Sequence, residues 1–196
     1  MKKLFITSIV VLSCISAFAQ FEKGRILAGG SVSFSSSTNK TKTDNATTTN
    51  SKTTSFDFGP RVGYFFIDHL AAGLSLDLST SSTKQEGSSD KDASTTFLIS
   101  PFVRYYLEPG IFFQGQYGIG PETEKSTNAS TTVTTKYTGS SWSLGAGYAY
   151  FLNSNVAVEP FIGYGARSRK LKDSDVKGVN SGLFINIGFQ VYLDRK

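Results

Sequence analysis

Cysteine and histidine are almost absent from this sequence. Its 196 residues contain one cysteine, Cys14, and one histidine, His69. Cys14 lies in an N-terminal segment that we expect to be removed on export, so the mature chain would have neither a disulfide nor thiol chemistry. No metal-ligand spacing, phosphate-binding loop or nucleophile elbow is visible elsewhere. We therefore expect no cofactor, no metal and no catalytic activity.

Long apolar runs are also missing. After the N-terminus no window approaches the roughly 18 uninterrupted apolar residues of a transmembrane helix. Thirteen per cent aromatic residues, 19 glycines and a mean hydropathy of −0.14 suit a single β domain in which apolar and polar residues alternate. The formal charge of +5 falls to +3 without Lys2 and Lys3, and this small, scattered excess does not suggest nucleic-acid binding.

Residues 1–19 have the pattern of a secretory signal peptide. Lys2 and Lys3 form its charged region, Leu4–Ser16 its apolar region, and Ala17-Phe18-Ala19 its cleavage motif. Cleavage after Ala19 would leave residues 20–196 as one mature domain. The alternative is a lipoprotein box at Leu12-Ser13-Cys14, but it would shorten the apolar region and ignore the better motif.

The rest of the chain alternates between two kinds of segment, and the pattern of the first kind is typical of β-strands. In Gly182–Leu193, Leu183, Ile185, Ile187, Phe189, Val191 and Leu193 share one parity, and successive side chains of a strand point to opposite faces. Eight such runs predict eight strands. They are Arg25–Ser36, Thr54–Phe65, Leu70–Thr80, Ser94–Tyr106, Ile111–Gly120, Gly139–Phe151, Val156–Ser168 and Gly182–Leu193.

The second kind of segment is a long polar tract. We expect these tracts to be mobile loops or hairpin extensions of the strands. These tracts are Ser37–Thr53, Ser81–Ala93, Pro121–Thr138 and Arg169–Val179. They alternate strictly with short turns, so all the long links would lie at one end of an up-and-down sheet. Outer-membrane barrels show this asymmetry, with short periplasmic turns and long outer loops.

Aromatic residues and prolines add two further expectations. Aromatic residues gather beside the short turns, where an interfacial girdle would lie: Tyr64, Phe65, Phe66, Tyr105, Tyr106, Tyr148, Tyr150 and Phe151. Pro60, Pro101 and Pro160 fall inside predicted strands, yet proline cannot donate a ladder hydrogen bond. We therefore expect a bulge or a missing hydrogen bond at each of these prolines.

Taken together, these features resemble the small outer-membrane β-barrels of the OmpA/OmpX type, in particular the Bacteroidetes-type β-barrel domain. The most specific match is the C-terminal assembly signal, carried here by Asn186, Gly188, Val191 and Leu193. The chain departs from it by adding Asp194-Arg195-Lys196. The resemblance implies an all-β, eight-stranded antiparallel transmembrane barrel in the outer membrane. It also implies a monomer, with outer-membrane lipid, lipopolysaccharide and the barrel assembly machinery as partners.

An eight-stranded barrel has a lumen just wide enough for side chains to fill it. We expect a polar network there, because buried charges require partners and both signs are present. Its predicted members are Asp57, Arg61, Asp77, Arg104, Gln114, Gln116, Glu159, Asn186 and Gln190. We expect His69 to be an exposed turn residue, and Glu122, Glu124, Asp173 and Asp175 to be solvated loop charges.

The expected function is a structural or surface-interaction role in the envelope, without catalysis. A narrow passage for small solutes or apolar ligands is the first alternative. An adhesin acting through the Ser/Thr-rich loops, a lipid-modifying enzyme and a secreted soluble sandwich are the others.

Overall fold

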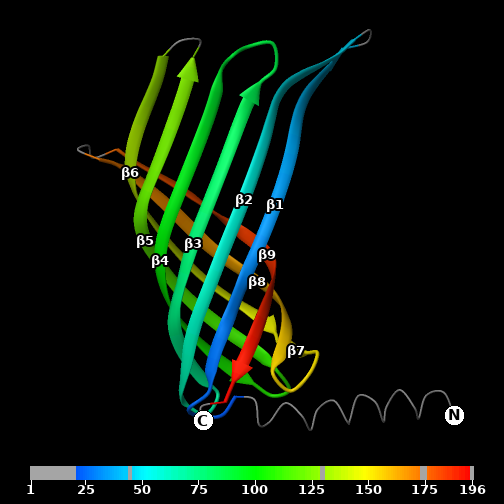
Figure 1. The fold of residues 1–196 in the computed structure, drawn as a ribbon, viewed down its shortest axis with the longest axis vertical. Coiled ribbons are helices and arrows are strands. Elements are labelled where there is room, and N and C mark those ends of the chain that lie inside the picture. Colours follow the sequence, from blue (N-terminus) through cyan, green and yellow to red (C-terminus); the bar gives the residue numbers. More distant parts are fainter. Residues whose placement is uncertain (1–20, 44–45, 129–130, 173–175, 195–196) are drawn as a thin grey trace, which may run out of the picture.

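The computed structural model describes residues 21–43, 46–128, 131–172 and 176–194. Most of them form β-strands (Figure 1). The strands are β1 (Ile26–Thr43), β2 (Ala46–Ile67), β3 (Leu70–Gln85), β4 (Lys91–Leu107), β5 (Ile111–Asn128), β6 (Thr131–Tyr148), β7 (Tyr150–Phe151), β8 (Val156–Leu171) and β9 (Lys177–Leu193). Among these residues none forms a helix long and apolar enough to cross a membrane.

All eight predicted strands are present, but they extend well into the polar tracts. The β1–β2 ladder continues to the pair Thr43↔Ala46, and the β5–β6 ladder to Asn128↔Thr131. Threonine favours strands, and cross-strand hydroxyl pairs add hydrogen bonds, as between Thr53 Oγ1 and Thr83 Oγ1 at 2.9 Å. Of the two expectations for these tracts, hairpin extension is confirmed.

The strands close into one antiparallel ring. β6 pairs with both β5 and β8, and β9 pairs with both β8 and β1. The two-residue β7 continues β6 beyond Ala149 and also pairs with β8, so the nine labelled strands form eight ribbons. The β1–β9 ladder runs from Ile26↔Leu193 to Gly30↔Phe189 and completes the ring. The predicted eight-stranded barrel is confirmed.

The apolar face of each ribbon points out of the ring. On β9, Leu183 and Ile185 are each 77% exposed, whereas Gln190 and Tyr192 are at most 1% exposed. Along β4, exposed and buried residues alternate from Ile99 to Leu107. All the strands described belong to one sheet, and no second sheet among them covers this outward face. The soluble sandwich would need such a cover, so its packing is not the one observed.

The three strand prolines interrupt the ladders, as expected. Pro60 pairs with Gly30, but the β2–β3 ladder has no pairs between Phe58 and Arg61. Pro101 lies at a gap in the β4–β5 ladder. Pro160 lies where β8 leaves β6 and joins β7. Each proline therefore occupies a position where one neighbouring strand requires no N–H donor.

The predicted aromatic girdle divides into two groups. Phe66, Tyr105, Tyr148 and Tyr150 are exposed on the outside, with Tyr64 half-buried beside Phe66. Phe65 and Tyr106 are instead buried inside the ring, and Phe151 packs against them. Assigning these three residues to the girdle was wrong, because consecutive residues of a strand cannot all share one face.

Candidate functional site in the barrel lumen

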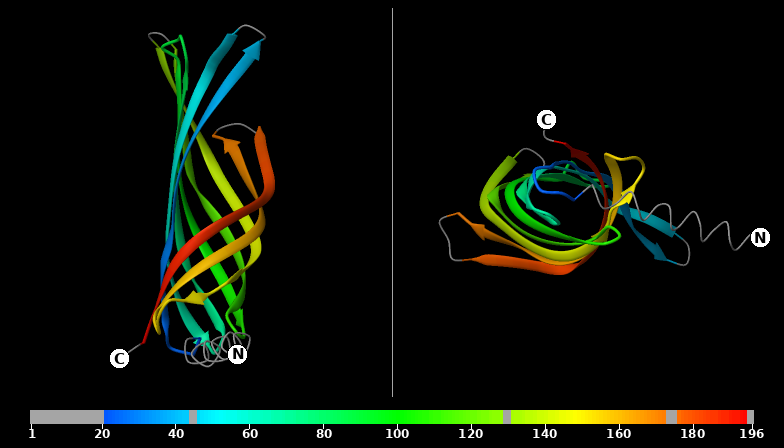
Figure 2. Two further views of the ribbon diagram at one scale, coloured as in Figure 1. Left: turned by 90° about the vertical axis from the view of Figure 1, so that its right-hand side faces the viewer. Right: turned by 90° about the horizontal axis from the view of Figure 1, so that it is seen from below.

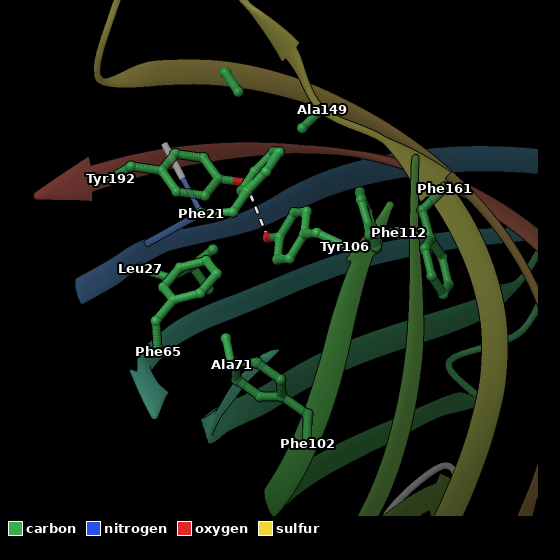
Figure 3. Packing of buried hydrophobic residues seen from close by; sticks show 11 residues of the cluster. Phe21, Leu27, Phe65, Ala71, Phe102, Tyr106, Phe112, Ala149, Phe161 and Tyr192 are labelled. Atoms are coloured by element: carbon green, nitrogen blue, oxygen red, sulfur yellow. Dashed lines mark hydrogen bonds between the residues drawn. The ribbon is translucent and has the colours of Figure 1, made fainter. Parts of the chain in front are cut away.

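An aromatic cluster fills the lumen at the short-turn end. Phe21, which precedes β1, inserts there and stacks on Tyr106 with 4.1 Å between ring centroids (Figure 3). Its backbone oxygen accepts a hydrogen bond from the His69 N–H at 2.7 Å. Phe65 and Tyr192 lie against Phe21, and Phe112 packs against Tyr106. None of these three side chains is more than 1% exposed. We call this buried cluster the aromatic plug.

Above the plug lies a buried ion pair. Arg104 Nη1 donates to Glu159 Oε2 at 2.6 Å, and the two side chains are 1% and 2% exposed. Arg104 also donates to Gln114 Oε1 and to Tyr106 Oη, and its guanidinium lies 4.0 Å from the Phe112 ring centroid. Tyr192 Oη donates to Glu159 Oε1 at 2.5 Å. The charges are thus held by several hydrogen bonds each, as a buried pair requires.

The hydrogen bonds continue across the lumen from Gln114. Arg61 Nη1 donates to Gln114 Oε1 at 3.0 Å, and Gln114 Nε2 donates to Gln116 Oε1 at 3.2 Å. Gln116 in turn donates to Asp77 Oδ2 at 3.1 Å, and Asp77 also accepts from Ser100. Five strands therefore contribute to one connected network above the plug: β2, β3, β4, β5 and β8.

A cavity of about 290 Å³ lies over this network. All nine residues that we expected in the lumen line it. They do not all pair as expected: Arg104 and Glu159 form an ion pair, whereas Asp57 accepts from Ser33 at 2.9 Å and Asp77 accepts from neutral groups. Gln190 is 1% exposed, and its Oε1 has no hydrogen-bond partner among the described residues.

A second ionic cluster lies towards the long-hairpin end. Arg167 donates to Glu122 Oε2 at 3.1 Å and to Thr96. Arg169 lies 3.3 Å from Glu124 Oε2 and 3.7 Å from Glu122 Oε1. Expecting Glu122 and Glu124 in loops was wrong, because β5 continues through both, and Glu122 is only 5% exposed. Their parity, which is that of Gln114 and Gln116, could have placed them in the lumen.

His69 also differs from its expectation. It has a positive φ of 66° in the turn between β2 and β3, and it is half-buried beside Phe21. Asp68 does not pair with it, but accepts from the Lys23 N–H at 2.7 Å. Within the described ranges, no group of three or more His, Cys, Asp or Glu residues could hold a metal ion. Asp173, Asp175, Cys14, Ala17 and Ala19 lie outside those ranges.

Charged residues are sorted by face along the strands. The carboxylates of the described strand segments lie on the inward parity, at Asp57, Asp77, Asp92, Glu122, Glu124 and Glu159. The arginines of the strands lie on the same inward parity, at Arg61, Arg104, Arg167 and Arg169. Lysine takes the opposite, lipid-facing parity, at Lys40, Lys52, Lys84, Lys91, Lys125, Lys136, Lys170 and Lys177. We call these eight residues the lysine ring.

The lysine ring lies beyond the last outward Leu, Ile or aromatic residue on all eight ribbons, at a similar spacing on most of them. On β2 only four positions separate Phe56 and Lys52, and on β9 the exposed Val179 lies between Leu183 and Lys177. On seven ribbons the lysine stands six positions beyond the last outward Leu, Ile or aromatic residue, as in Leu78 and Lys84, or Trp142 and Lys136. Three pairs of these lysines are directly opposed in the ladders. Lys84 faces both Lys52 and Lys91, and Lys170 faces Lys177.

Comparison with known proteins identifies the family. The family model described as "Outer membrane protein beta-barrel domain" matches residues 5–159 and again residues 87–196. The chain belongs to this outer membrane β-barrel family. The resemblance found in the sequence is thereby confirmed at family level, and its Bacteroidetes-type form stays a prediction. Membership places the barrel in the outer membrane.

Several solved barrels are similar to this family member. Neisserial surface protein A is 16% identical, with 86% of this chain and 97% of that chain covered and a TM-score of 0.48. The translocator domain of the autotransporter NalP from Neisseria meningitidis is 11% identical, with 96% and 69% covered and a TM-score of 0.47. OprG from Pseudomonas aeruginosa is 15% identical, with 89% and 98% covered and a TM-score of 0.42. No curated protein matches the chain.

The residues expected to form the assembly signal of the barrel lie together on β9. Val191 and Leu193 follow the outward parity, whereas Asn186 and Gly188 line the cavity. Their role in assembly stays a prediction.

Proposed function

We propose that this protein is a non-catalytic structural barrel of the outer membrane that binds anionic glycolipid of the outer leaflet, such as lipopolysaccharide, through its lysine ring. The observation that carries this proposal is the sorting of charge by face. A polar network in the lumen would explain why carboxylates and arginines point inward. It would not explain why the lysines point outward and lie just beyond the apolar belt.

The height of the ring suits the anionic groups of that leaflet. Six residues of strand span about 20 Å, or roughly 15 Å along the membrane normal for a strand tilted by about 40°. The ring therefore lies above the hydrocarbon, and flexible lysine side chains can reach down towards it. Each basic residue close to an anionic membrane surface contributes about 1 kcal/mol.

The opposed lysines strengthen the case for an anionic ligand. Like charges directly opposite each other on a sheet are destabilising. Lys52, Lys84 and Lys91 form such a row across three strands, and the same arrangement recurs at Lys170 and Lys177. Phosphate or carboxylate groups lying between the lysines would remove this repulsion.

Replacing the row tests the proposal. The triple variant Lys52→Gln, Lys84→Gln, Lys91→Gln should retain much less glycolipid after detergent extraction from native outer membranes, measured by phosphate and fatty-acid analysis. The matched triple Lys→Arg variant keeps the charge and should retain the wild-type amount. Equal retention by the Gln and wild-type proteins would contradict the proposal.

The proposed role includes a lumen that does not conduct. The aromatic plug and the Arg104–Glu159 pair support this part, because they fill the lumen below the cavity. A narrow passage is the second candidate, supported by the 290 Å³ cavity above them. Planar-bilayer recording distinguishes the two: the proposed barrel gives no stable conductance steps, whereas a passage gives them in the wild-type protein.

A further inference from the structure

The seam between the first and last strands is closed over only part of its length. Five residue pairs join β1 to β9, and the last is Gly30↔Phe189. Beyond it, β1 pairs only with β2, and residues Lys177–Gly188 of β9 pair only with β8. The two hairpins diverge there: in Figure 1 the upper ends of β1 and β2 lie to the right, and the outer ends of β8 and β9 lie to the left. The right-hand view of Figure 2 shows the same divergence.

The ladder ends at the depth of the apolar belt. Val32 and Phe34 on β1 are 61% and 71% exposed, and Ile185 and Ile187 on β9 are 77% and 58% exposed. Two strand edges thus face each other among lipid-directed side chains. Unpaired sheet edges are not stable in hydrocarbon, where each unsatisfied backbone group costs several kcal/mol. They are tolerated where they line a polar cavity, so something other than acyl chains must lie against them.

The lumenal cavity reaches both edges. Ser31 from β1 and Asn186 and Gly188 from β9 line it, together with Asp57 and Arg61 from β2. Gly188 has no side chain to close the gap. A Cβ built there would lie 3.5 Å from its nearest neighbours, which is ordinary contact. The lining of the polar cavity therefore includes both open strand edges.

We propose that this gap is a lateral portal that binds a single-chain amphiphile. Its polar head lies in the cavity and against the two strand edges, where it can hydrogen-bond their free backbone groups, and its acyl chain extends from the head into the bilayer beside Phe34 and Ile185. This inference does not rest on the lysine ring, which lies higher on the strands.

The cavity also indicates the chemistry of the head. It combines a carboxylate, Asp57, with a guanidinium, Arg61. A head with both a carbonyl or carboxylate oxygen and a hydroxyl or amide hydrogen would match these groups. A volume of about 290 Å³ is at the small end of ligand sites, which favours a small head over a large glycolipid head group.

A cross-linking experiment tests whether the seam is open. If the β1–β9 register continued upwards, Ser33 would lie opposite Asn186, at a separation that a disulfide can bridge. Residues 20–196 contain no cysteine, so introduced pairs have no background. The pair Ser33→Cys, Asn186→Cys should stay reduced in oxidised outer membranes. The control pair Ser75→Cys, Ser100→Cys, which is directly opposed in the β3–β4 ladder, should cross-link fully.

Two outcomes of that experiment would overturn the portal. Complete intramolecular cross-linking of the Ser33–Asn186 pair would show a closed seam. Cross-linked dimers would show that the edges pair with a second copy of the chain instead.

A binding experiment tests the occupant. Purified barrel is incubated with a fatty acid or an N-acylethanolamine of 16 carbons, and the bound fraction is measured by native mass spectrometry. Gly188→Leu, which places a side chain in the portal, should lower retention at least tenfold. Gly182→Leu lies on the same strand in open space and should leave it unchanged. Equal retention by both variants, or no retention by the wild type, would overturn the proposal.

A second blocking variant guards against a folding defect at Gly188. Ser31→Trp places a bulky ring at the opposite edge of the portal and should have the same effect on retention. Both variants are checked for the shift in gel mobility on boiling that a folded barrel shows. Undiminished retention by a folded Ser31→Trp barrel would exclude this portal.

Discussion

The two ends of this barrel differ in how far the charged side chains of the lumen are shielded from water. At the short-turn end the ladders close on all sides, aromatic rings fill the lumen, and Arg104 and Glu159 are 1% and 2% exposed. At the long-hairpin end the seam opens, and Arg169 is 46% exposed beside Glu122 and Glu124. Arginine–glutamate ion pairs therefore occur in one chain both where they are shielded from water and where the arginine is exposed to it. Their energies should differ accordingly.

The difference shows which parts of the lumen hold the barrel together. A buried charge that loses its partner is left without solvation, whereas an exposed one is rescreened by water. The aromatic plug and the Arg104–Glu159 pair should thus dominate stability. In the outer cluster the two arginines are 40% and 46% exposed and share Glu122, so the loss of one of them should cost less.

Removing Arg104 should have the largest effect. Arg104→Met leaves Glu159 buried without its cation and should lower the free energy of unfolding by about 3–5 kcal/mol. Urea unfolding in detergent micelles, followed by the fluorescence of Trp142, measures this loss. The double variant Arg104→Met, Glu159→Met removes both charges and should regain much of the stability. A double variant as unstable as the single one would show that packing, not the unpaired charge, sets the cost.

Shortening Phe21 should have the next largest effect. Phe21→Ala removes the ring that stacks on Tyr106 and leaves a cavity in the plug, which should cost about 3 kcal/mol. Phe66→Ala removes a ring that is 52% exposed on the outer face and should cost much less in the same urea titration. Similar losses in the two variants would mean that the plug is not a packed core.

A glycine substitution extends the comparison to the backbone. A Cβ at Gly147 would lie 2.3 Å from the Phe112 ring, whereas a Cβ at Gly182 would meet nothing within 4 Å. Gly147→Ala should therefore cost about 1–3 kcal/mol through overpacking. Gly182→Ala should change the unfolding midpoint little. The contrast would disappear if the plug were as loosely packed as the outer end.

The sequence was sufficient to predict the barrel and the face of each strand residue, but not the contacts that side chains make inside the lumen. Period-two alternation fixed the face of each residue, so Gln114, Gln116 and Gln190 could be assigned to the lumen before any contact was known. The alternation of long and short links gave the strand number and order. The prolines marked ladder gaps because a missing donor is a local property of one residue.

Which side chains meet in the lumen depends on which residues of different strands lie at the same height along the barrel axis. The pattern within one strand does not give this information. Phe21 precedes the first strand and has no periodicity to indicate that it inserts between Tyr106 and Tyr192. Tyr106 was assigned to the girdle because it lies near a turn, although its parity is that of Arg104 beside it. Glu122 was assigned to a loop because Ser and Thr around it resemble linker sequence. The incomplete β1–β9 ladder follows from the splay of whole hairpins, which no short pattern encodes.

The smallest effect is expected where the outer cluster is changed. Arg169→Met makes the same substitution as Arg104→Met, but removes a half-exposed guanidinium that lies 3.3 Å from Glu124 and 5.1 Å from the Tyr137 ring centroid. Water can solvate Glu124, which is 35% exposed, and the buried Glu122 keeps its contact with Arg167. The loss should therefore be below about 1 kcal/mol and should shrink further at high salt. Urea titrations at low and high salt measure both quantities. A salt-independent loss as large as that of Arg104→Met would mean that the outer end is as dry as the inner one, because only an unsolvated charge escapes screening.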